Sequence, residues 1–423
     1  MRILLFVLIF ITIIKANKFD DAFKLFLKNP QDSNTVQKAY FMIKGQNTQS
    51  LKEKTMFYII GGSYYIQSNQ KEVLKKLQKI YKDIKSPDLP PISYLKFEAL
   101  LEKNNTIQKV KLLKEAIKDN SAFFPSYYAL ASLYMDLKKY DLAIDILKRA
   151  LKYSIFTTKE KAKIYAFLAF AYREKRSFLD TKLDCIMQNN DLLKLSIQKA
   201  KEALKLNPKM YELYILLADD YNALGKDELA LSMLQRAKPF IKNDKNYKSY
   251  FEHILINCGA LESYLKMVKE KKDSNSTSTR AYAYFYAQKW KKALKYQKEI
   301  IAKKNYFYSY LRYVVINLQL NNKQKAKEIL QNIPPKSIDN DWKKALRANY
   351  LNKISDEALL KKADTVCKKS EANFYIGMKY YPKEKEKAYT YFKKVLNLKV
   401  YGYTEYIASK YFLAKSDKKK KNN

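Results

Sequence analysis

Apolar and small residues recur along the chain with the spacing of paired helices. Tyr127 to Tyr134 read Y-x-x-L-A-x-x-Y, and Ala143 to Ala150 follow as A-x-x-x-L-x-x-A. Residues three and four apart share one face of a helix, so each stretch predicts a helix with a single apolar face. A small residue such as Ala131 lets the two backbones approach closely. The segment therefore predicts two helices packed against each other.

The same pattern returns at a fixed interval. Tyr214 to Tyr221 and Ala230 to Ala237 repeat it, and a helix carrying Ser196 and Ala200 precedes that second half by 34 residues. Motif and period resemble the tetratricopeptide repeat (TPR), whose units are 34 residues long. The unit that starts at Tyr165 holds about fifteen extra residues around 173–189, which we expect to lengthen both of its helices.

Weaker copies extend the array in both directions. They are marked by Phe57, Gly61, Tyr64 and Leu77, by Leu113 and Ala116, by Tyr284 and Ala293, by Tyr313 and Ala326, and by Gly377, Tyr380 and Ala388. Two gaps, at 250–271 and 342–361, each have room for one divergent helix pair. We expect eight or nine units over residues 50–400. The fold class is all-α, a TPR-type α-solenoid forming a right-handed superhelix of antiparallel helix pairs.

The predicted organisation follows the quality of the repeats. It comprises a signal peptide over 1–16, a helical cap over 17–50, a regular array over 51–243 with its insertion near 173–189, a divergent array over 244–415 with a C-terminal capping helix, and a basic tail over 416–423.

The first residues resemble a secretory signal. Arg2 precedes an unbroken apolar run from Ile3 to Ile14, followed by Lys15 and Ala16. Such a run spans about 18 Å as a helix, which is short for a hydrocarbon core of about 30 Å. We expect cleavage after Ala16 and export to the periplasm. An uncleaved segment tethering the protein to the inner membrane is the alternative.

Two Asn-x-Ser/Thr motifs sharpen the expected compartment. Asn104 and Asn275 each carry an acidic residue two positions upstream, Glu102 and Asp273. This longer pattern is similar to the acceptor of bacterial periplasmic oligosaccharyltransferases. Ordinary polar turns are the alternative interpretation. The motif predicts glycosylation at both asparagines.

The charge of the chain is strongly positive, with a formal net charge of +40. An exported protein meets little nucleic acid, so we expect none as a partner. Anionic lipid, an acidic wall polymer or an acidic protein remain candidates. Codon drift in an AT-rich genome explains many lysines without any partner at all.

The chemistry of catalysis is sparse in the sequence. The single histidine, His253, predicts a helix-face residue rather than a metal ligand or a general base, and no phosphate-binding glycine loop is present. We expect no enzyme activity, no cofactor and no metal. Cys258 and Cys367 are expected to be buried free thiols, and Cys185 an exposed thiol able to pair with another molecule.

The resemblance to TPR proteins implies a binding groove. In that family, positions 2, 5, 9 and 12 of each first helix line a concave surface that binds peptides or helices. Carried over unit by unit, the expected groove residues are Tyr58, Tyr65, Tyr94, Glu98, Tyr128, Ser132, Met135, Phe170, Arg173, Ile215, Asp219 and Asn222. Tyrosine, arginine and methionine are favoured at interfaces.

The C-terminal stretches Glu371 to Tyr381 and Val400 to Tyr406 resemble the closing repeat of periplasmic TPR lipoproteins, in which a final helix, here 404–413, caps the array. The best-known of these are adaptors for cell-wall hydrolases and a protease. Architecture and compartment also resemble motility accessory proteins that scaffold the flagellar motor and stator. We therefore expect a non-enzymatic envelope scaffold or adaptor, with a motor or stator client ranked first. Direct binding of lipid or wall polymer by the basic surface is the alternative.

Overall fold

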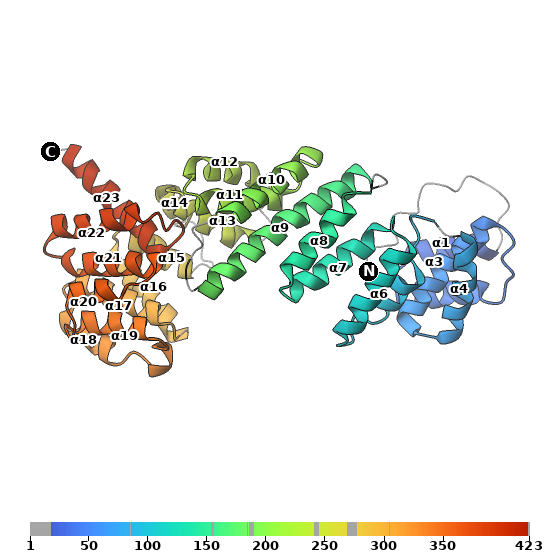
Figure 1. Cartoon of the computed structure of the whole chain (residues 1–423), viewed down its shortest axis with the longest axis horizontal. Coiled ribbons are helices and arrows are strands. Elements are labelled where there is room, and N and C mark those ends of the chain that lie inside the picture. The colour runs from blue at the N-terminus through green and yellow to red at the C-terminus, as the bar shows by residue number, and fades with distance from the viewer. Residues whose placement is uncertain are drawn as a thin grey trace. The chain divides into compact units, whose positions relative to one another are not determined.

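The computed structural model describes residues 18–421 apart from 85, 154–155, 184, 186–189, 241–244, 269–276 and 304. Its described residues form helices and no strand, which confirms the all-α prediction (Figure 1). The chain divides into two compact units, unit 1 ending at Lys175 and unit 2 beginning at Arg176. None of the described helices is long and apolar enough to cross a membrane. The predicted signal peptide lies outside the described residues.

Unit 1 contains α1 (Lys18–Lys28), α2 (Ser33–Ile43), α3 (Leu51–Ser68), α4 (Lys71–Ile84), α5 (Ile92–Glu98), α6 (Thr106–Asp119), α7 (Phe124–Asp136), α8 (Tyr140–Ala150) and most of α9 (Thr158–Leu183). Unit 2 continues with α10 (Asp191–Leu206), α11 (Tyr211–Ala223), α12 (Asp227–Ala237), α13 (Lys245–Asn257), α14 (Leu261–Val268), α15 (Thr277–Tyr286), α16 (Trp290–Lys303), α17 (Phe307–Gln319), α18 (Lys323–Gln331), α19 (Asp341–Tyr350), α20 (Asp356–Lys362), α21 (Val366–Tyr380), α22 (Lys385–Asn397) and α23 (Thr404–Lys421). A 3₁₀ turn, Pro335–Ser337, precedes α19.

Consecutive helices pack as pairs within each unit, from α3 with α4 to α21 with α22. The two divergent pairs expected in the gaps are present as α13 with α14 and α19 with α20. Between Leu51 and Asn397, nine pairs of consecutive helices pack together among the described residues, within the expected eight or nine. Helices as short as α5 and α20, seven residues each, leave little periodic signal in the sequence.

The extra residues of the insertion lengthen the helices, as predicted. Helix α9 has 26 residues and α10 has 16, whereas α7 has 13 and α8 has 11. The predicted capping helix is also present, as α23, and it starts at Thr404.

Small residues sit where paired helices touch. Ala131, Ala143 and Ala150 are fully buried, and Tyr127 beside them is buried too. A Cβ added at Gly61 would lie 3.1 Å from Leu77 Cδ2, so the glycine permits the close approach of α3 and α4. The repeat motif therefore encodes the distance between the two helices of each pair.

Several turns between paired helices place a residue other than glycine in left-handed backbone. Lys138, Gln288 and Asn321 have φ of 56°, 56° and 61°. Gly225 has φ of 69°, and a Cβ there would lie 2.4 Å from the Tyr401 ring. The positive φ and the nearby Tyr401 ring together require glycine at this turn.

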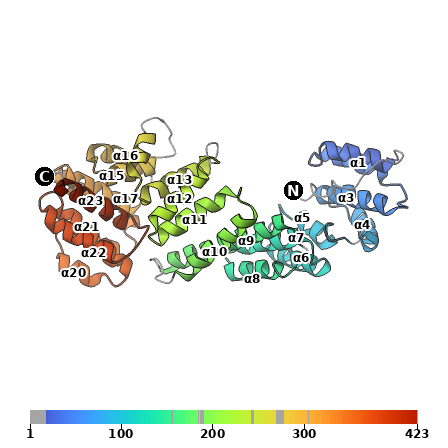
Figure 2. The same ribbon diagram turned by 90° about the horizontal axis from the view of Figure 1, so that it is seen from above.

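The last helix returns to the beginning of unit 2. Lys410 forms an ion pair with Asp227 of α12, and the Tyr411 hydroxyl donates a hydrogen bond to the carbonyl of Ile256 in α13. Phe412 is fully buried, with its ring 5.8 Å from Phe285 and 5.5 Å from Phe392. Figures 1 and 2 both show α23 beside α21 and α22. Helix α23 therefore joins the two ends of unit 2.

A disulfide makes a second connection across unit 2, and it corrects two predictions. Cys185 and Cys367 are bonded, with Cα atoms 5.6 Å apart and 182 residues between them in sequence. Both residues are buried, against Val400. The expectations of a free Cys367 and an exposed Cys185 were wrong, because they assumed that a repeat contacts only its neighbours. Cys258 is buried and free, as predicted.

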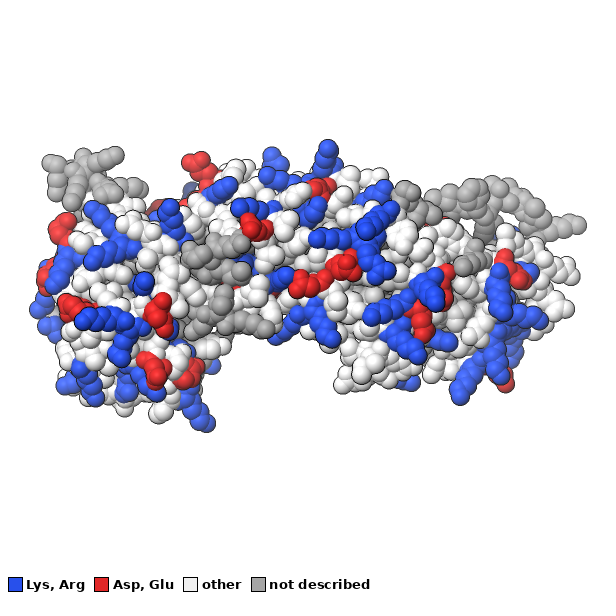
Figure 3. Space-filling view, viewed as in Figure 1, with Lys and Arg blue, Asp and Glu red and all other residues white. Residues whose placement is uncertain are grey.

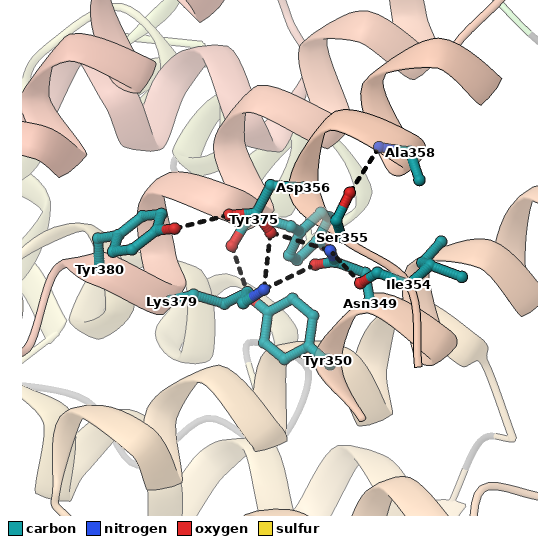
Figure 4. A network of polar contacts seen from close by, with 9 residues as sticks. All are labelled: Asn349, Tyr350, Ile354, Ser355, Asp356, Ala358, Tyr375, Lys379 and Tyr380. Atoms are coloured by element: carbon teal, nitrogen blue, oxygen red, sulfur yellow. Dashed lines mark hydrogen bonds and ion pairs between the residues drawn. The ribbon is translucent and has the colours of Figure 1, made fainter. Parts of the chain in front are cut away.

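A buried carboxylate ties the divergent pair α19–α20 to α21 (Figure 4). Asp356 accepts hydrogen bonds from Lys379 Nζ at 2.7 Å, Asn349 Nδ2 at 2.9 Å and the Tyr380 hydroxyl at 2.8 Å. Burial alone would raise the pKa of this carboxyl, but the bonds from Lys379, Asn349 and Tyr380 outweigh burial and lower the pKa.

Replacing this carboxylate should destabilise unit 2 in a pH-dependent way. At pH 7, Asp356→Ala should lower the free energy of unfolding by about 1–3 kcal/mol, because Lys379 and Asn349 lose their acceptor. A lowered pKa means that the stabilisation is present above about pH 4 and is lost as pH falls through the folded-state value. Urea unfolding at pH 7 and pH 3 should show that the variant and wild type differ less in their free energy of unfolding at pH 3. An unchanged difference would contradict the assignment.

Candidate protein-binding surface

Charge and aromatic residues are divided between the two helices of a pair. In unit 1, α3 has no charged residue after Lys54, and α7 has only Asp136. The second helix α4 carries five lysines against Glu72 and Asp83. Figure 3 shows lysine and arginine side chains gathered over α4, with few acidic ones among them. Helices α3 and α7 therefore offer a less charged surface than α4.

An aromatic side chain is exposed on the first helix α7. Tyr128 is 46% exposed, and its ring lies 5.0 Å from that of Phe167 in α9 and 6.0 Å from that of Phe124. Ser132 and Met135 follow Tyr128 at i+4 and i+7 on α7, and Phe170 and Arg173 follow Phe167 at i+3 and i+6 on α9; all four are half-buried. We call Tyr128 and these four residues the α7–α9 face. An exposed tyrosine supported by neighbouring rings suits a partner anchor.

Phe167 was missed by the sequence reasoning. It is half-buried and supports Tyr128 through the ring contact. Its signal was available, because it lies three residues before Phe170 and hence on the same side of α9. The groove residues were assigned from fixed positions of the repeat motif, and Phe167 is not at one of those positions.

Three of the expected groove tyrosines in unit 1 are buried instead. The Tyr58 hydroxyl donates to the carbonyl of Pro90 at 2.7 Å, and burial raises the pKa of this tyrosine. Tyr94 packs with its ring 5.1 Å from that of Phe123, and Tyr65 is also in the core. These side chains hold adjacent pairs together, so a partner could reach them only by repacking α3 and α5. Glu98 on α5 is half-buried.

In unit 2 the expected groove residues are likewise covered. Ile215 and Asn222 are buried, and the Asn222 amide donates to Asp227 at 3.4 Å. Asp219 is half-buried. Helix α13 packs on α11, the helix that carries all three. Of the twelve expected residues, five lie on the sides of α7 and α9 that carry Tyr128 and Phe167, whose rings are in contact.

Three buried charged groups inside unit 2 interact with residues of the same unit. Buried Arg312 donates to the Tyr282 hydroxyl at 2.9 Å and lies over that ring at 4.0 Å. Glu405 of α23 is buried as well, and burial raises the pKa of its carboxyl against the opposing charge of Arg312. Glu371 accepts from Trp342 Nε1 at 2.7 Å. These groups stabilise the interior of unit 2, where α23 supplies Glu405.

The first glycosylation motif lies at the surface. Asn104 is exposed in the bend between α5 and α6, and Thr106 is the first residue of α6. Asn105 between them caps that helix, its side-chain oxygen accepting from the Gln108 backbone at 3.1 Å. Asn275 lies outside the described residues. A transferase could reach Asn104 by loosening one helix end.

The described residues show no cluster of three or more His, Cys, Asp or Glu side chains that could hold a metal ion. His253 is exposed on α13, as expected for a helix-face residue.

Comparison with protein families finds none that matches the chain, and no curated protein matches its sequence. Similar solved structures include MamA AMB-1, at 17% identity and a TM-score of 0.31, covering 46% of this chain and 96% of that one. The C-terminal part of a TPR repeat-containing protein from Cytophaga hutchinsonii has 19% identity, a TM-score of 0.30 and coverages of 72% and 94%. A human IFIT1 dimer with PPP-AAAA has 14% identity and a TM-score of 0.30, covering 92% of this chain and 96% of that one. Because these TM-scores are low, we assign the helix-pair architecture from the helix–helix contacts of this chain.

Proposed function

We propose that the protein is a non-enzymatic scaffold or adaptor of the cell envelope that binds a protein partner through the α7–α9 face of unit 1. The observation that carries this proposal is the half-exposed Tyr128 of α7, whose ring is supported by those of Phe167 and Phe124. A large aromatic with few torsions to freeze buries much area at small entropic cost. Such a face suits a peptide or an amphipathic helix.

Two features support a periplasmic location. The buried Cys185–Cys367 disulfide belongs to oxidising compartments, because thiols in the cytoplasm are kept reduced. The apolar run Ile3 to Ile14 offers a route of export. For the client we rank flagellar motor and stator proteins first and cell-wall hydrolases or proteases second, on the resemblance of architecture and compartment alone.

Capture from envelope extract tests the partner site. Wild-type protein and Tyr128→Ala serve as baits, and a genuine client should bind the variant more weakly by about 1–3 kcal/mol. Tyr153→Ala is a matched control, since Tyr153 is also exposed but lies after α8. A client retained equally by all three baits would remove the α7–α9 face from the proposal.

Export predicts a defined topology. A reporter that is active only in the periplasm should be active when fused after Asn423, and mature protein should begin at Asn17. Retention of Met1 in exported protein would establish the anchored form instead. Reporter activity confined to the cytoplasm would exclude the envelope role.

Glycosylation predicts a change of mass. In a host with a periplasmic oligosaccharyltransferase, Asn104→Gln and Asn275→Gln should each remove the mass of one glycan. Stability should change by less than about 0.5 kcal/mol at exposed Asn104. If the intact mass of each variant differs from that of wild type only by the mass of the substituted side chain, neither motif is glycosylated and both are ordinary polar turns.

A further inference from the structure

Helix α4 presents a basic outer ridge. Lys71, Lys75, Lys79 and Lys82 are all exposed and fall at i, i+4, i+8 and i+11, so they line one side of the helix. The opposite side buries Val73, Leu77 and Ile80 in the core of unit 1. One of the two carboxylates on α4, Asp83, is bound by Lys54 at 2.7 Å. We call the four lysines the α4 ridge.

Two exposed apolar side chains lie next to this helix. Phe41 is 46% exposed and Met42 is 37% exposed, at the end of α2. Lys44 Nζ lies 4.3 Å above the Phe41 ring. Lys76 of α4 donates to the carbonyl of Lys44 at 2.8 Å, which fixes the end of α2 beside α4. Single exposed apolar residues are ordinary, but an adjacent pair bordered by lysines is a specific combination.

We propose that the α4 ridge, together with Phe41 and Met42, docks unit 1 on a bilayer that contains anionic phospholipid. The ammonium groups of the ridge complement lipid phosphates, and the two apolar side chains can enter the boundary between head groups and acyl chains. Nucleic acid or an acidic polymer would complement the positive charge, but neither offers an apolar region that could bury Phe41 and Met42. The combination therefore favours a lipid surface.

This docking surface differs from the proposed adaptor site. The α7–α9 face lies on first helices, whereas the ridge belongs to the second helix α4. Unit 1 can hold a protein client with one set of helices while the other rests on lipid. The inference does not depend on the identity of that client, nor on whether the client exists.

Vesicle sedimentation tests the proposal. Full-length protein purified from the periplasm is mixed with phosphatidylcholine vesicles with and without phosphatidylglycerol. Binding should require phosphatidylglycerol and weaken steeply as salt rises from about 0.1 to 0.5 M. Lys75→Gln with Lys79→Gln should weaken it roughly 25-fold, about fivefold for each lysine. Phe41→Ser with Met42→Ser should weaken it at unchanged net charge.

A matched control separates this ridge from the general positive charge. Lys291 and Lys295 are exposed on α16 of unit 2, and changing both to Gln removes the same charge. That variant should bind within about twofold of wild type, because its charge lies outside the docking surface. The apolar run Ile3 to Ile14, where it is retained, adds binding that salt does not weaken, so the readout is the salt-sensitive part.

Several results would overturn the proposal. Absence of salt-sensitive binding to phosphatidylglycerol vesicles would do so. Equal losses from the α4 and α16 lysine pairs would show attraction by overall charge, and an unaffected Phe41/Met42 variant would remove the apolar contribution. Circular dichroism establishes that each variant is folded. Should the α2 variant unfold, the two exposed lysine pairs still decide the outcome.

Discussion

Cys367→Ala should lower the free energy of unfolding by about 3–5 kcal/mol under oxidising conditions, the largest effect we expect of a single substitution. The disulfide joins residues 182 positions apart, and its loss frees the unfolded chain to sample far more conformations. Urea denaturation followed by circular dichroism measures the change. Dithiothreitol should lower the stability of wild type to that of the variant.

Cys258→Ala is the control for this experiment, since Cys258 is buried and free. Its stability should still respond to dithiothreitol, whereas that of Cys367→Ala should not. Alkylation without reduction adds a test of compartment. Denatured protein from the envelope should expose one reactive thiol, and protein held in the cytoplasm should expose three. Three thiols in envelope protein would contradict the disulfide.

Leu130→Ala should cost about 2–5 kcal/mol of unfolding free energy, because Leu130 is fully buried between the paired helices and its loss leaves a cavity. Thermal and urea unfolding both report the change. Binding of a client by protein that remains folded should be preserved, since Leu130 does not reach the α7–α9 face.

The neighbouring substitution should behave in the opposite way. Tyr128→Ala removes a side chain that is nearly half exposed, so we expect it to lower the free energy of unfolding by less than about 1 kcal/mol. The same substitution should weaken binding of the client protein. The two residues lie two positions apart on α7 and face different directions. Loss of folding in Tyr128→Ala with a normal melting temperature in Leu130→Ala would show that the helix register is wrong.

The helix pairs could be predicted from sequence because their signal is local. Ala131, Ala143 and Ala150 recur where backbones touch, and all three are fully buried. The two divergent pairs followed from the length of the gaps alone. Their own motifs were weak, because a seven-residue helix such as α20 shows barely two turns of periodicity.

The groove residues were less predictable, since they depend on how neighbouring pairs stack. Tyr58 and Tyr128 were assigned from the same motif position, yet one is buried under Pro90 and the other is exposed. The disulfide was missed for a similar reason. Nothing near Cys185 in the sequence indicates that α21 lies beside it, because the meeting depends on the path of the intervening helices.

The contacts of α23 set an order for the folding of the two units. Helix pairs of unit 1 are made of neighbours in sequence and can form as soon as they emerge, as local contacts form quickly. Unit 2 differs, because Lys410 pairs with Asp227 across 183 residues and Tyr411 bonds Ile256 across 155. Its interior is incomplete until the last twenty or so residues have been made. Unit 2 therefore completes its packing only when α23 docks, so truncation before Thr404 should destabilise unit 2 and leave the helix pairs of unit 1 folded.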